Sequence, residues 1–319
     1  MMTYPLTDSL PNPLFRAMLD FRRSLGWRVT SLFANGEQGV WYDPSDLSTL
    51  FQDSAGTTPV TAVGQPVGLM LDKSKGLVLG PELVTNGALT SGTGWTDTGI
   101  ATITYSTAGA RIVSPANGAT LLSQNYAGAV NKTYVVDAEV VMHATPLTAA
   151  AVAVNIGGFG EDLFVATQIG LIAGNTYRLH GKVRLTSATT FNLRIGSNLA
   201  LNYALDFTIR NLSVRELPGN HASQATAGKR PLLKAGAAQY LDFDIVDDAL
   251  VAAFPAALGS TCTVALAVPG VGASILTGQT IGTTYTLTQD TSAVIITTDA
   301  LTAGETTSLT AWLNAKAGV

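Results

Sequence analysis

Charged residues are scarce in this sequence. They make up 13% of its 319 residues, whereas hydrophobic residues make up 46%; an ordinary globular chain carries about 25% charged residues. A chain with so little charge either lies in a membrane or covers much of its surface by assembly. No uninterrupted apolar run reaches the length of about 18 residues that a bilayer requires. We therefore expect no membrane insertion and favour assembly.

Basic clusters and cysteine pairs are also missing. The net charge is −4, and the densest group of cations is Arg22, Arg23 and Arg28. Three charges are too few to neutralise a phosphate backbone, so we expect no nucleic-acid partner. The single cysteine, Cys262, excludes an intrachain disulfide. It lies in the alternating stretch STCTVALAV, which indicates a buried strand thiol.

Motifs for catalysis are absent as well. His143, His180 and His221 are scattered without the spacing of a metal site, and we expect them in loops or on the surface. The sequence has no G-x-S-x-G elbow and no evident base for its one thiol. No pair of carboxylates has a spacing that favours a glycosidase over solvated side chains. We therefore expect a protein that is not an enzyme and that has no cofactor.

Helical patterns occur at the two ends of the chain. Residues 12–27 have Asn12 as a cap and one wide apolar stripe. This stripe must be covered either by its own domain or by another subunit. Residues 302–318 begin with Thr302 and Glu305, which have the spacing of a capping box, and end at Gly318.

The remainder has the period-two alternation of β-strands. Short alternating segments closed by Gly, Asn, Ser or Thr run from about residue 79 to 217, and again from 220 to the C-terminal helix. Seven or more strands at this spacing are typical of an antiparallel sandwich or jelly roll. We predict an all-β protein of two β-sandwich or jelly-roll domains, with an N-terminal and a C-terminal helix.

Two segments that lie far apart in the chain resemble one continuous sequence of bacteriophage and prophage virion proteins. These segments are GVWYDPSDLSTLFQDSAGTTPVTAVGQPVGLMLDKS (39–74) and GNHASQATAGKRPLLKAGAAQYLDFDIVDDAL (219–250). In such proteins the second follows the first almost directly and opens a concanavalin/laminin-G-like sandwich. The C-terminal ALTAGETTSLTAWLNAKAGV is similar to their terminal helix. The resemblance implies a discontinuous sandwich formed by residues 36–76 and 218–319, after an N-terminal attachment segment (1–35).

The residues between them, 77–217, resemble a jelly-roll carbohydrate-binding module of the kind found in phage fibres. Their opening PELVTNGALTSGTGW and closing LDFTIRNLSVREL are similar to the first and last strands of that family. The resemblance implies an inserted domain whose two ends lie together, which makes insertion into a loop inexpensive. It also implies that Trp95 is a buried core residue.

The sequence departs from both families. Ala88 and Arg210 stand where the module family carries acidic residues near a structural calcium. A methyl group and a cation are not calcium ligands, so we expect no metal there. About 65 residues follow Phe254, too few for a complete laminin-G-like fold. Part of a sheet must therefore be missing or be supplied by a neighbouring subunit.

Two local clusters remain as candidate sites. DFDIVDD holds four acidic residues, which form either a calcium loop or, as we favour, a strand with Asp242 and Asp244 outward and then a turn of Asp247 and Asp248. Sugar binding requires aromatic rings flanked by amides, and Tyr126 beside Gln124 and Asn125 is the best candidate for it.

We therefore expect a non-enzymatic virion structural protein, most simply a tail-fibre or spike subunit that recognises host-surface glycan. The resemblance implies a trimer that contacts other virion proteins and is assembled in the bacterial cytoplasm. The alternatives are a capsid or tail decoration protein with a structural jelly roll and, less favoured, a glycan-cleaving enzyme.

Overall fold

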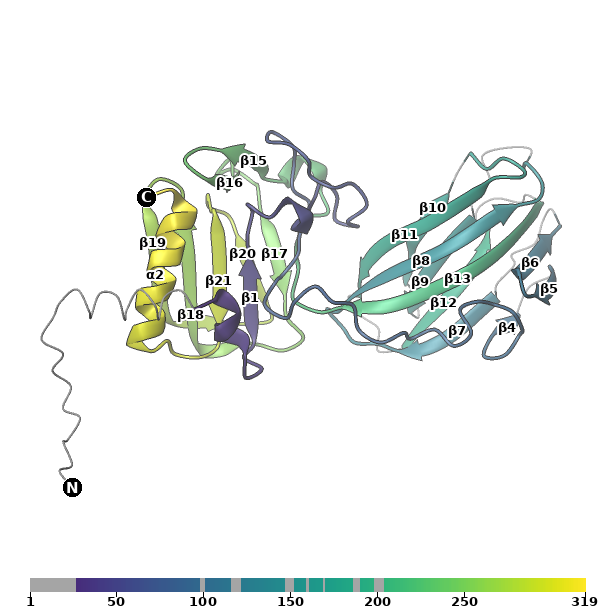
Figure 1. Cartoon of the computed structure of the whole chain (residues 1–319), viewed down its shortest axis with the longest axis horizontal. Helices are drawn as coiled ribbons and strands as arrows, with labels where there is room; N and C mark the ends of the chain where they lie inside the picture. Colours follow the sequence, from purple (N-terminus) through teal and green to yellow (C-terminus); the bar gives the residue numbers. More distant parts are fainter. Residues whose placement is uncertain are drawn as a thin grey trace, which may run out of the picture.

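The computed structural model describes residues 27–97, 101–115, 122–146, 152–158, 161–168, 170–185, 190–197 and 204–319. It confirms an all-β fold with a C-terminal helix. The strands form two bodies, each around its own core. We call residues 27–76 with 218–319 the host body and residues 77–217 the guest body; Figure 1 shows them side by side, with the helix α2 at the far end of the host.

The host body is a sandwich of two antiparallel sheets. The first host sheet has the order β1-β21-β18-β19, and the second has the order β2-β3-β14-β17-β20. A hairpin, β15 with β16, lies beside them. The strand bounds are β1 Gly39–Tyr42, β2 Leu50–Phe51, β3 Leu69–Met70, β14 Ala222–Ser223, β15 Leu232–Ala235, β16 Gln239–Asp242, β17 Leu250–Ala253, β18 Gly259–Val268, β19 Gly272–Ile281, β20 Thr284–Leu287 and β21 Ala293–Thr297.

Helix α2 (Ala303–Ala317) covers the outer face of the first host sheet. Its Leu309 and Leu313 are buried with residues of a 3₁₀ helix, η1 (Val29–Phe33), and with small residues of β18 and β21. The predicted capping box of Thr302 and Glu305 is confirmed, as is the left-handed stop at Gly318. Cys262 is buried in β18, as expected. The helix expected over residues 12–27 falls outside the described residues except for Trp27.

Two further 3₁₀ turns, η2 (Leu47–Thr49) and η3 (Ala227–Lys229), lie in the connections of the host body. No helix within the described ranges is long and apolar enough to cross a membrane.

The guest body is a second antiparallel sandwich. The first guest sheet has the order β11-β8-β13-β6-β5, and the second has the order β10-β9-β12-β7-β4. Trp95 is buried in the core between them, and its indole N–H donates to the carbonyl of Asn86. The strand bounds are β4 Thr96–Asp97, β5 Thr102–Ser106, β6 Gly109–Ser114, β7 Leu122–Ala127, β8 Thr133–Met142, β9 Val152–Gly158, β10 Glu161–Gln168, β11 Thr176–Arg184, β12 Thr190–Ser197 and β13 Leu205–Leu217.

The chain leaves the host body and returns to it at one place. Strand β3 pairs with β14, so Leu69–Met70 lies beside Ala222–Ser223 although about 150 residues separate them in the sequence. The outgoing segment then runs beside the end of β13, where the amide of Gly80 donates to the carbonyl of Glu216 at 2.9 Å. The two ends of the guest body are therefore neighbours.

A buried polar network joins the outgoing and returning segments on the host side. The carboxylate of Asp72 is fully buried and accepts from the amides of Trp41, Ser74 and Asn220 and from the Ser74 hydroxyl, at 2.8–2.9 Å. Burial raises the pKa of Asp72 in spite of these four donors. The returning chain passes so close that a Cβ on Gly219, whose φ is +117°, would lie 3.0 Å from Asp72 Oδ2.

His221 belongs to the same network. It was predicted in a loop or on the surface, and it lies in the connection between β13 and β14 but is buried. Its side chain is 2% exposed, and Nδ1 accepts from the amide of Asp72 at 2.9 Å. Burial, together with a smaller effect of nearby cations such as Lys182, lowers the pKa of His221 to about 4. A lone histidine has no neighbours in the sequence that reveal such a position, because its surroundings come from two distant segments.

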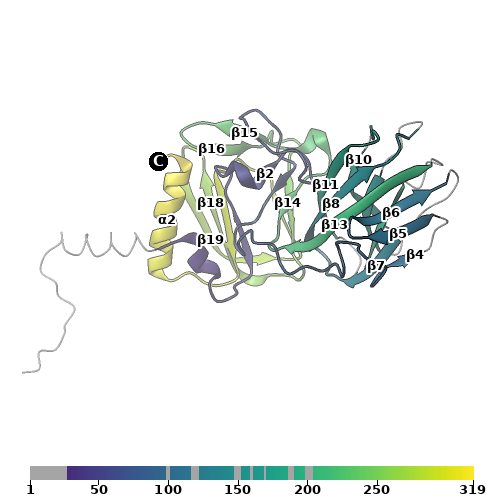
Figure 2. The ribbon, with the colours of Figure 1, turned by 45° about the vertical axis from the view of Figure 1, so that its right-hand side comes forward.

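The two bodies share an interface with apolar and polar contacts. Val135 and Leu217 of the guest pack against Leu69 and Leu71 of the host. Lys182 Nζ donates to the carbonyl of Gly56 at 2.9 Å and lies 4.2 Å from the centre of the Phe51 ring. Figures 1 and 2 show the guest on the side of the host opposite α2. These contacts hold the guest in a defined position.

A small cavity lies in this interface. Its volume is about 20 Å³, and its lining includes Arg184 and His221. Nη1 of Arg184 is buried and has no hydrogen-bond partner among the described residues. The volume is enough for one water molecule, which such a buried donor requires.

Candidate functional site

The first guest sheet has an outer face of polar and charged residues. In β8, the side chains of Val136, Ala138 and Val140 are buried in the guest core, whereas Asp137 and Glu139 alternate with them and point outward. This is the alternation expected of a strand with one buried face. The host body covers the near end of this outer face at Lys182 and leaves the far end open.

Ion pairs cross from strand to strand over the open part. Arg178 of β11 binds Asp137 Oδ1 through Nε at 3.0 Å and Nη2 at 2.5 Å, and His180 Nδ1 lies 2.9 Å from the same oxygen. Arg210 of β13 donates to Glu139 Oε2 at 2.8 Å. We call these five residues the polar face.

Two features of the backbone and charge extend the polar face across the sheet. A bulge in β13 between Arg210 and Ser213 places Asn211 at φ +53°, and its Nδ2 donates to Glu139 at 3.2 Å. On the next strand, Arg111 binds both oxygens of Asp206 at 2.8–2.9 Å. Hydrogen bonds from Arg111 lower the pKa of Asp206, and the same pair raises the pKa of Arg111.

The chemistry of the polar face suits hydrogen bonding to a polyhydroxylated or charged ligand. Exposed ion pairs of this kind contribute only about 0–1 kcal/mol to stability. Their carboxylate and guanidinium groups are planar and offer paired acceptors and donors. No aromatic ring stands among the described outward positions of this sheet, so the face offers a ligand polar contacts and no ring to stack on.

The three residues expected to bind glycan lie on β7 of the second guest sheet. Gln124 is 7% exposed; its Oε1 accepts from the Thr85 amide, and its Nε2 donates to the carbonyls of Thr85 and Gly94. Both amide donors are thus used inside the protein, so Gln124 stabilises the turn around residues 85–94 and is a poor sugar ligand. Asn125 is exposed. The side chain of Tyr126 lies outside what the structure describes.

Arg210, one of the two positions at which the sequence departs from the resemblance to the module family, forms an ion pair with Glu139. The prediction that this position holds no metal remains a prediction.

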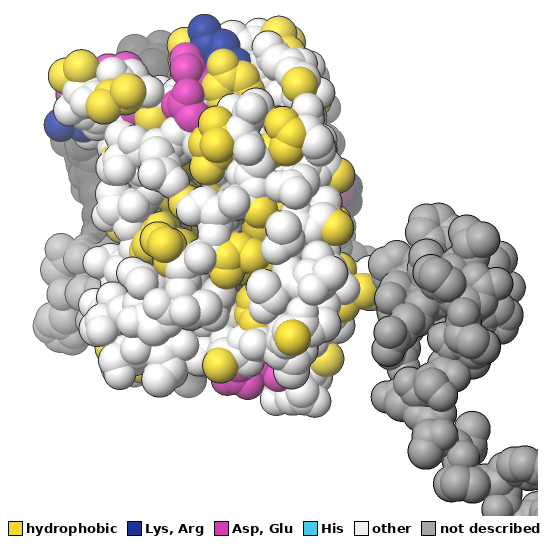
Figure 3. All heavy atoms as spheres, turned by 90° about the vertical axis from the view of Figure 1, so that its left-hand side faces the viewer, with side chains coloured by type: hydrophobic (Ala, Val, Ile, Leu, Met, Phe, Trp, Pro, Cys, Tyr) yellow, Lys and Arg dark blue, Asp and Glu magenta, His cyan; other side chains and the backbone are white. Residues whose placement is uncertain are grey.

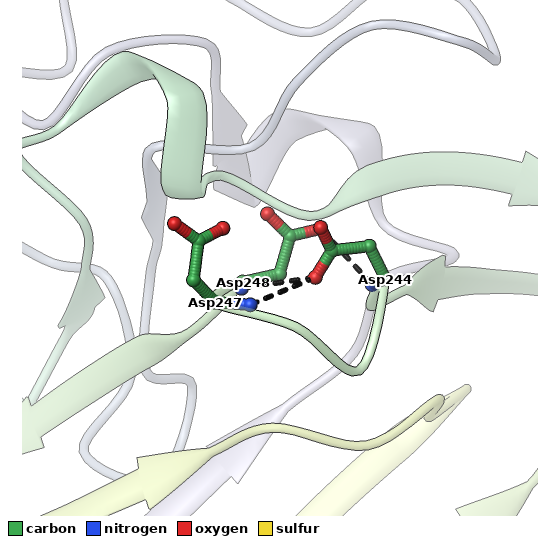
Figure 4. Close-up of side chains that lie close together, drawn as sticks. All are labelled: Asp244, Asp247 and Asp248. Atoms are coloured by element: carbon green, nitrogen blue, oxygen red, sulfur yellow. Dashed lines mark hydrogen bonds between the residues drawn. The ribbon is translucent and has the colours of Figure 1, made fainter.

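The acidic cluster in DFDIVDD forms a loop after β16. Asp244 Oδ1 accepts from the amides of Val246, Asp247 and Asp248 at 2.9–3.1 Å, as Figure 4 shows in part. These hydrogen bonds lower the pKa of Asp244. The strand ends at Asp242, so Asp244 closes the turn instead of continuing the strand as expected. The cluster is the only group of three or more His, Cys, Asp or Glu with metal-like spacing among the described side chains.

The other two histidines are exposed, as predicted. His180 belongs to the polar face, and His143 Nε2 lies 2.7 Å from the Thr208 hydroxyl on the same sheet. The alternation of the sequence places each of these side chains on a face, but their partners depend on the register between strands. Such cross-strand pairs therefore could not be read from the sequence alone.

No protein-family model matches this chain, and no curated protein matches it. Solved structures with some likeness include the xylan-binding module CBM15, at 16% identity and TM-score 0.34 over 44% of this chain and 97% of that one. Another is the enzymatically active domain of tailspike protein 4 of bacteriophage CBA120, at 10% identity and TM-score 0.32 over 42% of this chain. A third is the Clostridium thermocellum xylanase 10B fragment with xylohexaose, at 13% identity and TM-score 0.31 over 43% of this chain.

This chain spans 21% of the tailspike domain and 29% of the xylanase fragment. Likenesses at this level do not identify a function for this chain.

Proposed function

We propose that this protein is a non-enzymatic virion structural protein, a tail-fibre or spike subunit, whose guest body binds host-surface glycan at the polar face. The observation that carries the proposal is the open row of arginine–carboxylate pairs on an inserted sandwich that the host body holds in place. The resemblance of residues 39–74 and 219–250 to virion proteins supports the assignment to a particle.

The arrangement of the two bodies supports a division of tasks. The host body carries the C-terminal helix and the uncharged residues 249–289, which would suit assembly, and the guest body lies on the side opposite α2. A ligand at the polar face therefore does not compete with contacts at the α2 end of the host.

Binding is non-covalent in this proposal. Sugar hydroxyls replace part of the cross-strand pairing by donating to Asp137 or Glu139 and accepting from Arg178 or Arg210. A single shallow polar site of this kind is weak, and many copies on one particle multiply its affinity through effective concentration.

A glycan array of bacterial surface polysaccharides, probed with the full chain, tests the proposal. The matched variants are Arg178→Gln with Arg210→Gln, on the polar face, and Asn125→Ala, on the other sheet. We expect the parent and Asn125→Ala to bind the same glycans and the double arginine variant to lose at least ten-fold in affinity. Circular dichroism of all three should be the same, because exposed pairs contribute little to stability.

The other functions give different results in the same experiment. Silence of the parent on the array favours a decoration protein whose jelly roll is structural. Shortening of a bound polysaccharide over time favours a glycan-cleaving enzyme. Loss of binding in Asn125→Ala alone moves the site to the second guest sheet, where Tyr126 also lies.

A further inference from the structure

Within the described residues, both sheets of the host sandwich end at the same side with a strand that has a partner on one edge only. Strand β19 is the last strand of the first host sheet, and β20 is the last strand of the second. Only Gly282 and Thr283 separate these two strands in the chain. In the described part of the chain, the sandwich is therefore open along one seam, bordered by the outer edges of β19 and β20. At the start of β19 the amide of Ala273 donates to Asn314 Oδ1 of α2 at 2.8 Å, so the open part of this edge lies beyond Ala273.

The interior of the sandwich is exposed at this seam. A cavity of about 150 Å³ lies there, lined by Val264, Leu276, Ile281, Tyr285 and adjacent polar residues. Leu276 pairs in register with Val264, so the two side chains share the face directed at the core. Val264 is 3% exposed, whereas Leu276 is 51% exposed. A core-facing leucine is thus left half uncovered, because none of the described strands pairs with the outer edge of β19.

The seam also lacks the charges that normally protect an edge strand. Residues 249–289, which include β17, β18, β19 and β20, contain no Asp, Glu, Lys, Arg or His. Natural monomers prevent edge-to-edge pairing with charged side chains, prolines, bulges or very short strands. Strand β19 is ten residues long and has neither charge nor proline. It has one bulge, between Leu276 and Gln279, so the regular part of its edge is Ser274–Leu276.

Figure 3 views the molecule from the end that bears α2 and β19. White and yellow side chains cover most of this end of the host body, and blue and magenta ones gather near its upper and lower rims. The uncharged residues between these rims can meet the same residues of another copy without charge repulsion. They offer nothing that would select a charged partner.

We propose that the occupant of this edge is a second copy of the chain, whose β19 pairs antiparallel with β19 of the first about a two-fold axis. The pairing joins the two first host sheets into one sheet of eight strands. It satisfies the edge backbone groups of β19 beyond Ala273 in both copies, and it covers Leu276 of each copy. The inference does not depend on glycan binding, because the seam belongs to the host body alone.

The test is the solution mass of the full chain, measured by light scattering from about 1 to 100 μM. We expect twice the chain mass of 33.0 kDa at the upper concentration. Leu276→Lys and Thr277→Lys place a charge on the edge and should weaken dimerisation at least ten-fold. Val246→Lys is the matched control: Val246 is 85% exposed, lies on the loop after β16 and does not line the cavity, and this change should leave the mass unaltered.

Thr277→Lys keeps the test decisive if Leu276→Lys fails to fold, because Thr277 is exposed and lines no core. A parent that stays monomeric at 100 μM overturns the inference. A trimer, which the sequence resemblance implies, overturns it too, since edge pairing about a two-fold axis closes at two copies. A dimer with the same dissociation constant in all variants places the contact elsewhere and also overturns it.

Discussion

The host and guest bodies are both antiparallel sandwiches, yet they differ in where charged side chains lie. The guest presents Arg178, Asp137, Glu139 and Arg210 as cross-strand pairs on the outside of a sheet. The host has an uncharged run over residues 249–289 that includes its open seam. A face rich in exposed pairs remains solvated and available to a polar ligand, whereas an uncharged edge favours another protein surface. The scarcity of charge in this chain is thus most pronounced in residues 249–289 of the host body.

The two bodies are joined at a few defined contacts. Each has its own apolar core, and the links between them are the Asp72 network and the Val135–Leu69 contact region. Substitutions in the network therefore test whether the host depends on the segments that flank the insertion.

The largest effect is expected for Asp72→Ala. The change leaves the buried amides of Trp41, Ser74 and Asn220 without their acceptor, and we expect the free energy of unfolding of the host to fall by about 3 kcal/mol or more. Urea unfolding followed by tryptophan fluorescence measures it. A Trp95→Phe background removes the guest tryptophan, so that the signal reports the host.

The exposed Asp299 supplies the control for this prediction. Asp299→Ala should change the free energy of unfolding by less than about 0.5 kcal/mol. An equal, small change in both variants would show that the Asp72 network does not hold the two host segments together.

The next effect is a pH dependence that comes from His221. Its pKa is lowered from 6.5 to about 4 in the folded protein, so between these values the unfolded chain binds a proton that the folded chain does not. Stability from this residue is complete above pH 6.5 and falls by about 1.4 kcal/mol per pH unit as the pH drops toward 4. Asp72, whose pKa is raised, acts in the opposite direction at the acidic end.

His221→Gln should flatten this dependence. Urea midpoints at pH 7, 6 and 5 are compared between the parent and the variant, so that contributions from other groups largely cancel. A parent and variant with parallel pH profiles would show that the imidazole is accessible to protons in the folded state.

A smaller effect is expected at the start of α2. The Thr302 hydroxyl accepts from the amide of Glu305 in the capping box, and Thr302→Ala should lower the free energy of unfolding by about 1 kcal/mol. Thr307→Ala, in the middle of the same helix, is the control: it should leave stability unchanged or slightly higher, because alanine has the better helix propensity. Thermal unfolding of both variants makes the comparison.

The features that the sequence predicts well are those written in neighbouring residues. The capping box of α2, the buried thiol of Cys262 and the period-two strands of β8 all depend on local spacing. The pairing of β3 with β14 has no local signal, and only a resemblance to proteins without the intervening residues suggests it. The burial of His221 and Gln124 was missed because their partners come from segments about 150 and 39 residues away.

The candidate site also has features with a local sequence signal and features without one. Alternation predicts that Asp137 and Glu139 face outward, but the register that brings Arg178 and Arg210 to them is set by the whole sheet. The three residues chosen from the sequence, Gln124, Asn125 and Tyr126, lie on the other sheet. Sequence proximity of an aromatic ring and amides did not distinguish a surface cluster from a strand with one buried face.

Removal of the guest body tests the division into host and guest most directly. Residues 81–215 are replaced by Asn-Gly, which joins Gly80 to Glu216, whose backbone atoms are 2.9 Å apart. We predict that the shortened chain keeps the helical signal of α2 and unfolds in one cooperative transition, at a lower midpoint because Leu69 and Leu71 lose their cover. A shortened chain with no cooperative transition would contradict the account, since the host would then not be a body of its own.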